Sequence, residues 1–294
     1  MNSSKDSRKY LIRFIIAMAA FGTIGIFRRF IPLDSGIIAM ARGIIGAVFI
    51  FIFLAVRGRP FAFSHLKGKI WQIMLIGAIM GFNWVTLFEA YNYTAVSTAT
   101  LCYYMEPLFL ILISPFVFRE KITWKKLLCV LVAFVGMIFV SGVLSSEVGT
   151  NDLTGIVFGL LSAVLYAIVV SWSRLITDVD PYEKTALQLL SAGVVMIPYL
   201  LAKGAFADSS LAASFTPLTI TMLAIVCIVH TGIVYLMYFE SINHIKVSQI
   251  AVLSYIDPVV AIILSQVILH ENMGWQGLIG AVLILGAAFV SEKV

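Results

Sequence analysis

Residues 88–107 of this chain read FEAYNYTAVSTATLCYYMEP, and residues 239–258 read FESINHIKVSQIAVLSYIDP. A single shift of 151 residues, with no gap, aligns these two segments and also places Trp124 on Trp275. Chance does not align so many polar and aromatic residues at one offset. The chain is therefore predicted to contain an internal duplication.

The composition around these segments is that of a protein embedded in lipid. Of the 294 residues, 61% are hydrophobic and only 12% are charged, and the mean hydropathy is +1.02. The apolar residues form stretches of about 18 to 23 residues, the length that a helix needs to cross a bilayer. We therefore predict an all-α integral membrane protein with ten transmembrane helices, at residues 10–31, 35–56, 69–91, 95–118, 124–144, 152–173, 182–202, 217–241, 246–269 and 275–291.

The duplication divides these ten helices into two units of five. Residues 1–145 form the first unit, residues 146–151 a polar linker, and residues 152–294 the second unit. Earlier in the units the match is weaker, and an offset near 145 aligns Phe21 with Tyr166. Because five is odd, the second unit enters the membrane from the opposite face, which makes the repeats inverted. Inverted repeats place a substrate site near the midplane between the halves and suit alternating access.

The distribution of basic residues gives an orientation. Sixteen of the 20 Lys and Arg residues fall on the same side of the membrane as the N-terminus in this arrangement of spans. Three fall on the other side, and Arg42 lies within a span. The positive-inside rule then predicts a plasma membrane protein with both termini in the cytoplasm. Because the net charge of +5 resides in short loops, it does not indicate nucleic-acid binding. The three cysteines lie inside apolar spans without metal-ligand spacing, so we expect no metal and no cofactor.

Three short segments of the first unit resemble a known family. They are Glu89-Ala-Tyr-Asn-Tyr-Thr-Ala-Val-Ser, Tyr103-Tyr-Met-Glu-Pro and Arg119-Glu-Lys-Ile-Thr, and the first two recur from Glu240 and Ser254. The chain resembles the drug/metabolite transporter superfamily, specifically EamA-domain proteins with two tandem EamA units. This resemblance covers about residues 12 to 291 and implies transport of a small metabolite. Since the family moves amino acids, nucleotides, sugars and other metabolites, it does not identify the substrate.

Two carboxylates are predicted near the membrane midplane. Glu106-Pro107 and Asp257-Pro258 lie near the centres of the fourth and ninth spans, where a charge is expensive in lipid and normally faces the bundle interior. Each proline breaks helical hydrogen bonding and frees a backbone carbonyl four residues earlier. Two facing acids would repel one another, which favours retention of a proton and suits proton coupling. The alternative is a proline kink with a protonated, hydrogen-bonded acid.

Further candidates lie on the same helices. Arg42 can pair with a carboxylate or an anionic substrate group, or else extend to the extracellular surface. Glu89 and Glu240, at the ends of two spans, are gate candidates or helix-end charges. Hydrogen-bonding and aromatic side chains that can line the cavity, or alternatively pack in the core or at the membrane interface, are Asn83, Trp84, Tyr103, Tyr104, His230, Tyr235, Tyr238, Ser254 and Tyr255.

The function expected from these features is secondary active transport. Export of amino acids or related metabolites is the first expectation, and import of a nucleotide-like or cationic metabolite is the alternative. A membrane-embedded enzyme is disfavoured because no H-E-x-x-H or G-x-S-x-G motif is present. A scaffold would have little use for an inverted repeat. The expected partners are a small-molecule substrate, protons and the lipid bilayer, for a monomer or homodimer.

Overall fold

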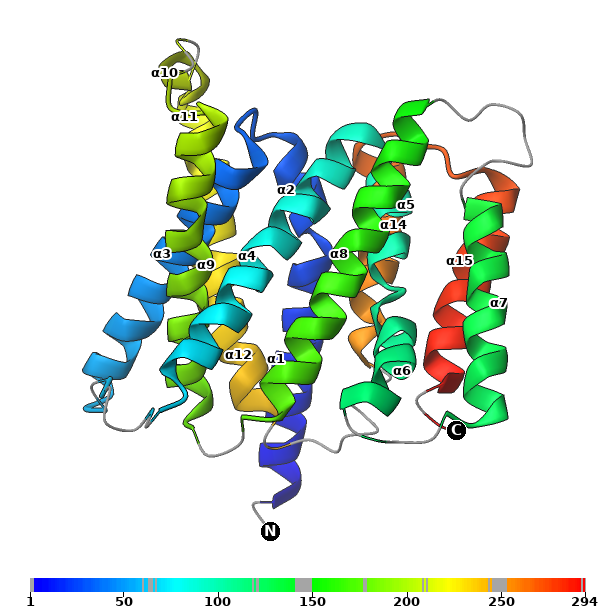
Figure 1. Ribbon diagram of the computed structural model, residues 1–294, viewed down its shortest axis with the longest axis horizontal. Helices are drawn as coiled ribbons and strands as arrows, with labels where there is room; N and C mark the ends of the chain where they lie inside the picture. Colours follow the sequence, from blue (N-terminus) through cyan, green and yellow to red (C-terminus); the bar gives the residue numbers. More distant parts are fainter. Residues whose placement is uncertain are drawn as a thin grey trace.

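The computed structural model describes residues 3–59, 61–62, 66, 68–117, 119, 122–140, 150–176, 179–207, 209, 211–242, 244, 253–291 and 293. Helices are the only regular secondary structure among them (Figure 1). Their bounds are α1 Ser3–Gly22, α2 Ile24–Arg29, α3 Ser35–Val56, α4 Ile70–Tyr93, α5 Val96–Tyr103, α6 Glu106–Val117, α7 Trp124–Val140, α8 Thr150–Arg174, α9 Pro181–Lys203, α10 Leu211–Ser214, α11 Pro217–Ala224, η3 Ile225–Ile233, α12 Val234–Ile242, α14 Ile256–Ile268 and α15 Gly274–Ser291.

Eight helical segments of the described chain are long and apolar enough to cross a membrane. Large apolar side chains also cover the outside of the molecule; Val282, for example, is 72% exposed. Such a surface suits contact with lipid tails rather than water. The chain is thus a multi-pass membrane protein, with candidate spans at Arg8–Arg29, Ser35–Val56, Ile70–Tyr93, Val96–Val117, Asp152–Arg174, Pro181–Lys203, Pro217–Tyr238 and Gly274–Ser291.

The predicted spans agree with these helices in position but not in continuity. Each of the ten predicted segments overlaps a described helix, although α7 and α14 are shorter than the eight spans above. Residues 141–144 and 246–252 of the predicted spans lie outside the described residues. The first segment begins earlier, at Ser3, and is interrupted at Thr23. Helix α8 begins at Thr150, inside the predicted linker, while residues 146–149 lie outside the described residues.

Two interruptions occur at equivalent places in the repeats. Helix α5 ends at Tyr103 and α6 begins at Glu106, which places Pro107 in the first turn of the new helix. Likewise a turn at Tyr255 precedes α14, whose first turn contains Pro258. Proline clashes with the preceding turn inside a helix but is well tolerated at a helix start. The prolines therefore explain why both helices restart here, 151 residues apart.

Glycines allow pairs of helices to approach closely. Helices α3 and α9 lie side by side (Figure 1), and a Cβ on Gly43 of α3 would collide with the backbone of Gly193 and Leu189 on α9. A similar contact joins α7 to α15 at Gly136 and Gly280. Small residues at such interfaces permit backbone contact where no hydrophobic effect drives association.

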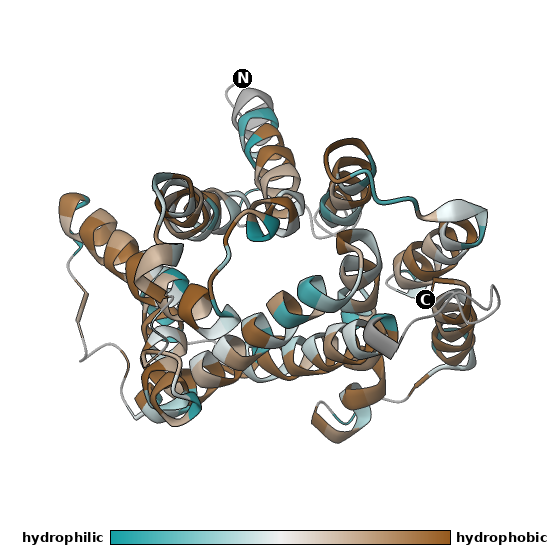
Figure 2. Ribbon diagram, turned by 90° about the horizontal axis from the view of Figure 1, so that it is seen from above, coloured by the Kyte–Doolittle hydropathy of each residue, from teal (hydrophilic) through white to brown (hydrophobic). Residues whose placement is uncertain are grey.

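The two ends of the chain lie at the same end of the bundle (Figure 1). We call this end the termini face and the other end the opposite face. Seen along the bundle, the helices surround a central region, and hydrophobic residues are present on all of the long helices (Figure 2). Helices from both predicted repeats border this region.

Candidate functional site

A cavity of about 940 Å³ lies between the helices of the two predicted repeats. It is lined mainly by α1, α4, α5, α6, α8, α12 and α14. The structure brings together eleven of the residues nominated from the sequence: Arg42, Trp84, Tyr103, Tyr104, Glu106, Pro107, Tyr235, Tyr238, Ser254, Tyr255 and Asp257.

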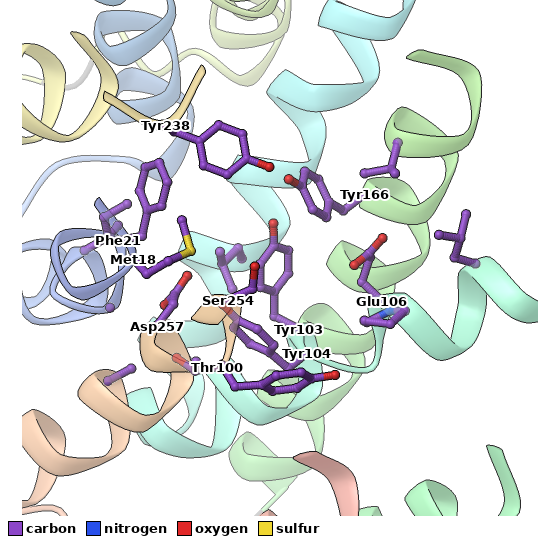
Figure 3. A pocket seen from close by; sticks show the side chains of 18 of the residues that line it. Met18, Phe21, Thr100, Tyr103, Tyr104, Glu106, Tyr166, Tyr238, Ser254 and Asp257 are labelled. Carbon is purple, nitrogen blue, oxygen red and sulfur yellow. The ribbon is translucent and has the colours of Figure 1, made fainter. Parts of the chain in front are cut away.

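The two nominated carboxylates face this cavity from opposite sides (Figure 3). Glu106 is the first residue of α6, and Asp257 is the second residue of α14. Both therefore lie directly after a helix interruption, in the first turn of the new helix. The cavity thus holds two acidic groups on equivalent helices of the two repeats.

Aromatic rings form much of the remaining wall. Tyr103 packs against Tyr104 and Tyr166, with ring centroids 6.0 Å and 5.4 Å apart. Tyr238 lies beside Tyr166 in Figure 3. Such walls offer both hydrogen-bonding hydroxyls and flat apolar surfaces to a ligand.

Other residues of the wall were not nominated from the sequence. Among them are Met18 and Phe21 on α1, Thr100 on α5 and Tyr166 on α8. The alignment of Phe21 with Tyr166 at an offset near 145 was the available signal, since both residues line the cavity.

Arg42 reaches the cavity rather than the membrane surface. Its side chain is only 3% exposed, and its Nε donates a hydrogen bond to Thr231 Oγ1 at 2.7 Å. The guanidinium lies over the ring of Trp84, 4.3 Å from the ring centroid. The alternative expectation, extension to the extracellular surface, is not the arrangement found here.

Three other nominated residues lie away from the cavity wall. Asn83 is buried against α8, where its Nδ2 donates to Ser162 O at 2.7 Å and Ser162 Oγ at 2.8 Å. His230 is buried, with Nε2 2.7 Å from Thr23 Oγ1. Pro258 is also buried, beside Asp257 in the first turn of α14.

The structure describes the side chain of one of the two gate candidates, Glu89 and Glu240. Glu89 accepts a hydrogen bond from Asn92 of its own helix at 3.2 Å, so it does not join the two repeats by that bond. Glu240 is part of α12, but its side chain lies outside the described side chains.

The cavity extends to the termini face. Lys126 at the start of α7, Arg174 at the end of α8 and Lys293 near the C-terminus all contribute to its wall. These three basic residues belong to the side on which most Lys and Arg residues were predicted. Basic side chains therefore line the cavity near the termini face, and Glu106 and Asp257 line it deeper inside.

Polar contacts join the repeats at the opposite face. Arg29 Nη2 lies 3.0 Å from Glu271 Oε1, and it also donates to Thr94 O at 2.8 Å. The other carboxylate oxygen of Glu271 accepts from the backbone N–H of Val96 at 2.8 Å. Burial raises the pKa of Glu271, an effect that Arg29 and the Val96 amide oppose. Thr94 additionally donates to Asp152 at 3.2 Å.

Together these features define a class: a multi-pass membrane protein whose helices surround a polar, aromatic cavity accessible from one face. Comparison with known proteins then gives the family. The EamA-like transporter family model matches residues 8–142 and 153–292. The chain belongs to the EamA-like transporter family, with two tandem units, which confirms the resemblance predicted from the sequence.

Individual relatives agree with this assignment. The chain is 30% identical to the uncharacterized transporter YxxF of Bacillus subtilis (strain 168) over 266 residues, 90% of this chain and 83% of that protein. It is 24% identical to the biotin transporter of Escherichia coli (strain K12), covering 88% of this chain and 84% of that protein. A crystal structure with 19% identity superposes with a TM-score of 0.63 over 97% of both chains, which shows a shared fold.

Proposed function

We propose that this protein is a secondary active transporter that exports amino acids or related small metabolites across the plasma membrane by alternating access. The observation that carries the proposal is a cavity between the two family units that extends to the termini face, with polar contacts joining the units at the opposite face. A cavity with these properties is expected of one state in an alternating-access cycle.

The helix contacts support an inverted repeat of ten spans. Helix α4 packs against α8, and its counterpart α12 packs against α1. The contact of α3 with η3 corresponds in the same way to the contact of α9 with α4. The contact of α14 with α1 corresponds to the contact of α5 with α8. Exchanging the two halves therefore leaves these contacts unchanged. A two-fold relation of this kind lets one chain adopt two states that differ in which face is open.

The basic residues at the entrance support the orientation. With the termini in the cytoplasm, the cavity described here faces the cytoplasm, and the Arg29–Glu271 contact lies at the extracellular face. An exporter must bind its cargo from this cytoplasmic side. The two acids in the cavity supply groups that can exchange a proton for the amine of a bound amino acid.

Counterflow in proteoliposomes tests the proposal. Purified protein is reconstituted into liposomes preloaded with one unlabelled amino acid, and entry of the same labelled amino acid is followed. A carrier produces transient accumulation of label above equilibrium, whereas a channel or an enzyme does not. Absence of counterflow for all twenty amino acids and for biotin, in vesicles shown to contain folded protein, would refute it.

A further inference from the structure

Arg42 is a buried cation in the middle of the bundle. It lies on α3, eight residues from the start of that helix, and its side chain is 3% exposed. It also contributes to the wall of the cavity beside Trp84, Leu87 and Tyr91. Burying a charge in a membrane protein is costly, so its retention at this depth requires compensating contacts or a ligand.

Thr231 contacts one edge of this guanidinium, and an aromatic ring covers one of its faces. Thr231 Oγ1 accepts from Arg42 Nε at 2.7 Å, while the Thr231 hydroxyl itself donates to Val226 O at 2.9 Å. The threonine therefore presents a lone pair to Arg42. The ring of Trp84 covers the guanidinium face at 4.3 Å, and Phe88 lies further out, at 5.8 Å. These contacts fix the guanidinium plane without neutralising its charge.

Two features of the backbone build this arrangement. Thr231 lies in the π-helical segment η3, where its hydroxyl reaches the carbonyl five residues earlier. π-Helical turns inside longer helices occur frequently at functional sites. Gly46, one turn after Arg42, brings α3 close to η3, because a Cβ there would lie 2.6 Å from the methyl group of Thr231.

The outer nitrogens of Arg42 remain without an acceptor in the described part of the chain. Its only hydrogen bond there is the one from Nε, and no described carboxylate forms an ion pair with it. Nη1 and Nη2 thus present their N–H groups beside the cavity in the planar fork that matches a carboxylate. Glu106 and Asp257 in the same cavity disfavour a ligand with several negative charges.

We propose that Arg42 binds the carboxylate of the transported molecule, so that the cargo is a monocarboxylate. The inference rests on the proposed transport function and specifies its substrate class. The carboxylate pairs with the fork of Arg42, and the adjoining part of the cargo contacts Trp84 and Leu87. In an amino acid, the amine then lies toward the acidic part of the cavity.

Binding of matched compounds to the purified full-length protein tests this assignment. The probes are the twenty L-amino acids and biotin, each beside its amide, together with inorganic phosphate. The measurement is the melting temperature of the detergent-solubilised protein. At least one acid is expected to raise it, while the matching amide and phosphate do not. An amide as effective as its acid, stabilisation by phosphate, or no response to any acid would overturn the proposal.

Variants separate Arg42 from general effects of charge. Arg42→Gln is expected to weaken binding of the responsive acid by about 10- to 100-fold, because a charge-assisted hydrogen-bond pair is lost. Arg42→Lys retains the charge but not the planar fork, so its affinity for the acid should lie between those of the parent and Arg42→Gln. Arg57→Gln, at the exposed end of the same helix, serves as the control. Unchanged acid binding by Arg42→Gln would overturn the proposal, and the acid–amide comparison decides the matter should that variant not fold.

The outcome also distinguishes this inference from the transport function. Counterflow of a compound without a carboxylate would leave transport intact and refute the role of Arg42. Acid binding that depends on Arg42, without counterflow of any compound, would refute transport instead.

Discussion

The guanidinium of Arg29 and the carboxylate of Glu271 lie 3.0 Å apart and join the two repeats at the opposite face. Glu271 also occupies a capping position for α5, because it accepts from the N–H of Val96 while the N-cap residue Ala95 has no side chain that can do so. Loss of a cap costs about 0.5–2 kcal/mol, more than a partly exposed ion pair contributes. Closure of this face therefore depends on Glu271 chiefly through the helix start.

Glu271→Ala is expected to shift the molecule toward opening at this face. Ser97, the buried second residue of α5, is a suitable reporter when changed to cysteine, with the three native cysteines replaced by alanine. Labelling by a membrane-impermeant maleimide should be about 2- to 30-fold faster in Glu271→Ala. Glu89→Gln is the control, because the bond from Asn92 lies within one helix. Equal labelling of Glu271→Ala and the parent would contradict the capping role.

The same carboxylate predicts a pH dependence with a definite sign. Its pKa is raised in the closed arrangement, so the closed molecule binds the proton more tightly than one in which water surrounds Glu271. Proton binding by Glu271 therefore stabilises the closed arrangement as the pH falls toward the usual pKa of glutamate. This stabilisation is lost as the pH rises through the raised pKa of Glu271. Maleimide labelling of the Ser97→Cys reporter, corrected for thiol ionisation, should therefore slow at acidic pH in the parent. Glu271→Gln should lack this component, and identical pH profiles would show the prediction to be wrong.

Close packing of α3 on α9 predicts a large difference between two glycine substitutions. Gly43→Ala places a methyl group against the backbone of Gly193 and Leu189, which cannot move without separating the helices. Overpacking of this kind costs about 1–3 kcal/mol. Gly286→Ala on α15 meets no atom within 4 Å and should be neutral or slightly stabilising. Melting temperatures of the two solubilised variants decide it, and equal values would contradict the packing argument.

The sequence predicted positions along the chain better than orientations around a helix. Hydropathy located the spans, and the Glu106-Pro107 and Asp257-Pro258 pairs marked both helix restarts, since proline acts through local geometry. The same reasoning left Asn83 open between the cavity wall and the core, and in the structure it is buried against α8. A helix that is apolar on all sides gives no periodic signal for its rotation, so only packing decides which face is inward.

Two further features had no sequence signal beyond, for Tyr166, its weak alignment with Phe21. The π-helical segment η3 contains no proline, and it differs from an α-helix only in hydrogen bonds that span five residues. Tyr166 in an apolar span reads equally well as a core residue or an interface aromatic. Its role in the wall depends on the neighbouring Tyr103 and Tyr238, which come from distant parts of the chain.

The position of Asn83 predicts a structural role rather than a role in selectivity. Nδ2 donates to Ser162 O and Oγ, and Ser162 Oγ returns a bond to Asn83 O at 3.1 Å. Asn83→Ala removes the two hydrogen bonds from Nδ2, while the bond from Ser162 Oγ to the backbone carbonyl of residue 83 remains, so the expected cost is about 0.5–1.5 kcal/mol for each lost bond. Thr86→Ala, whose hydroxyl bonds only within α4, is the milder control. Asn83→Ala should lower the melting temperature and leave the relative transport rates of different cargoes unchanged; altered cargo preference in a stable variant would reverse this assignment.

Glu106 and Asp257 predict the coupling of transport to protons. Two ionised carboxylates that face one cavity repel each other, which favours retention of a proton by one of them. Exchange of that proton for cargo links transport to the pH gradient. Accumulation of labelled cargo in proteoliposomes should respond to an imposed pH gradient in the parent and lose that response in Glu106→Gln combined with Asp257→Asn.

Conservative variants separate the proton from the shape of the side chain. Glu106→Asp and Asp257→Glu keep a titratable group at each position and should retain a response to the gradient, even if the rate falls. The single variants Glu106→Gln and Asp257→Asn show which acid exchanges the proton. The variant that loses the response to the pH gradient identifies that acid. Counterflow without a gradient should survive in every variant that still binds cargo, since it requires no driving proton. A double variant that still accumulates cargo along the pH gradient would exclude these two acids as the coupling groups.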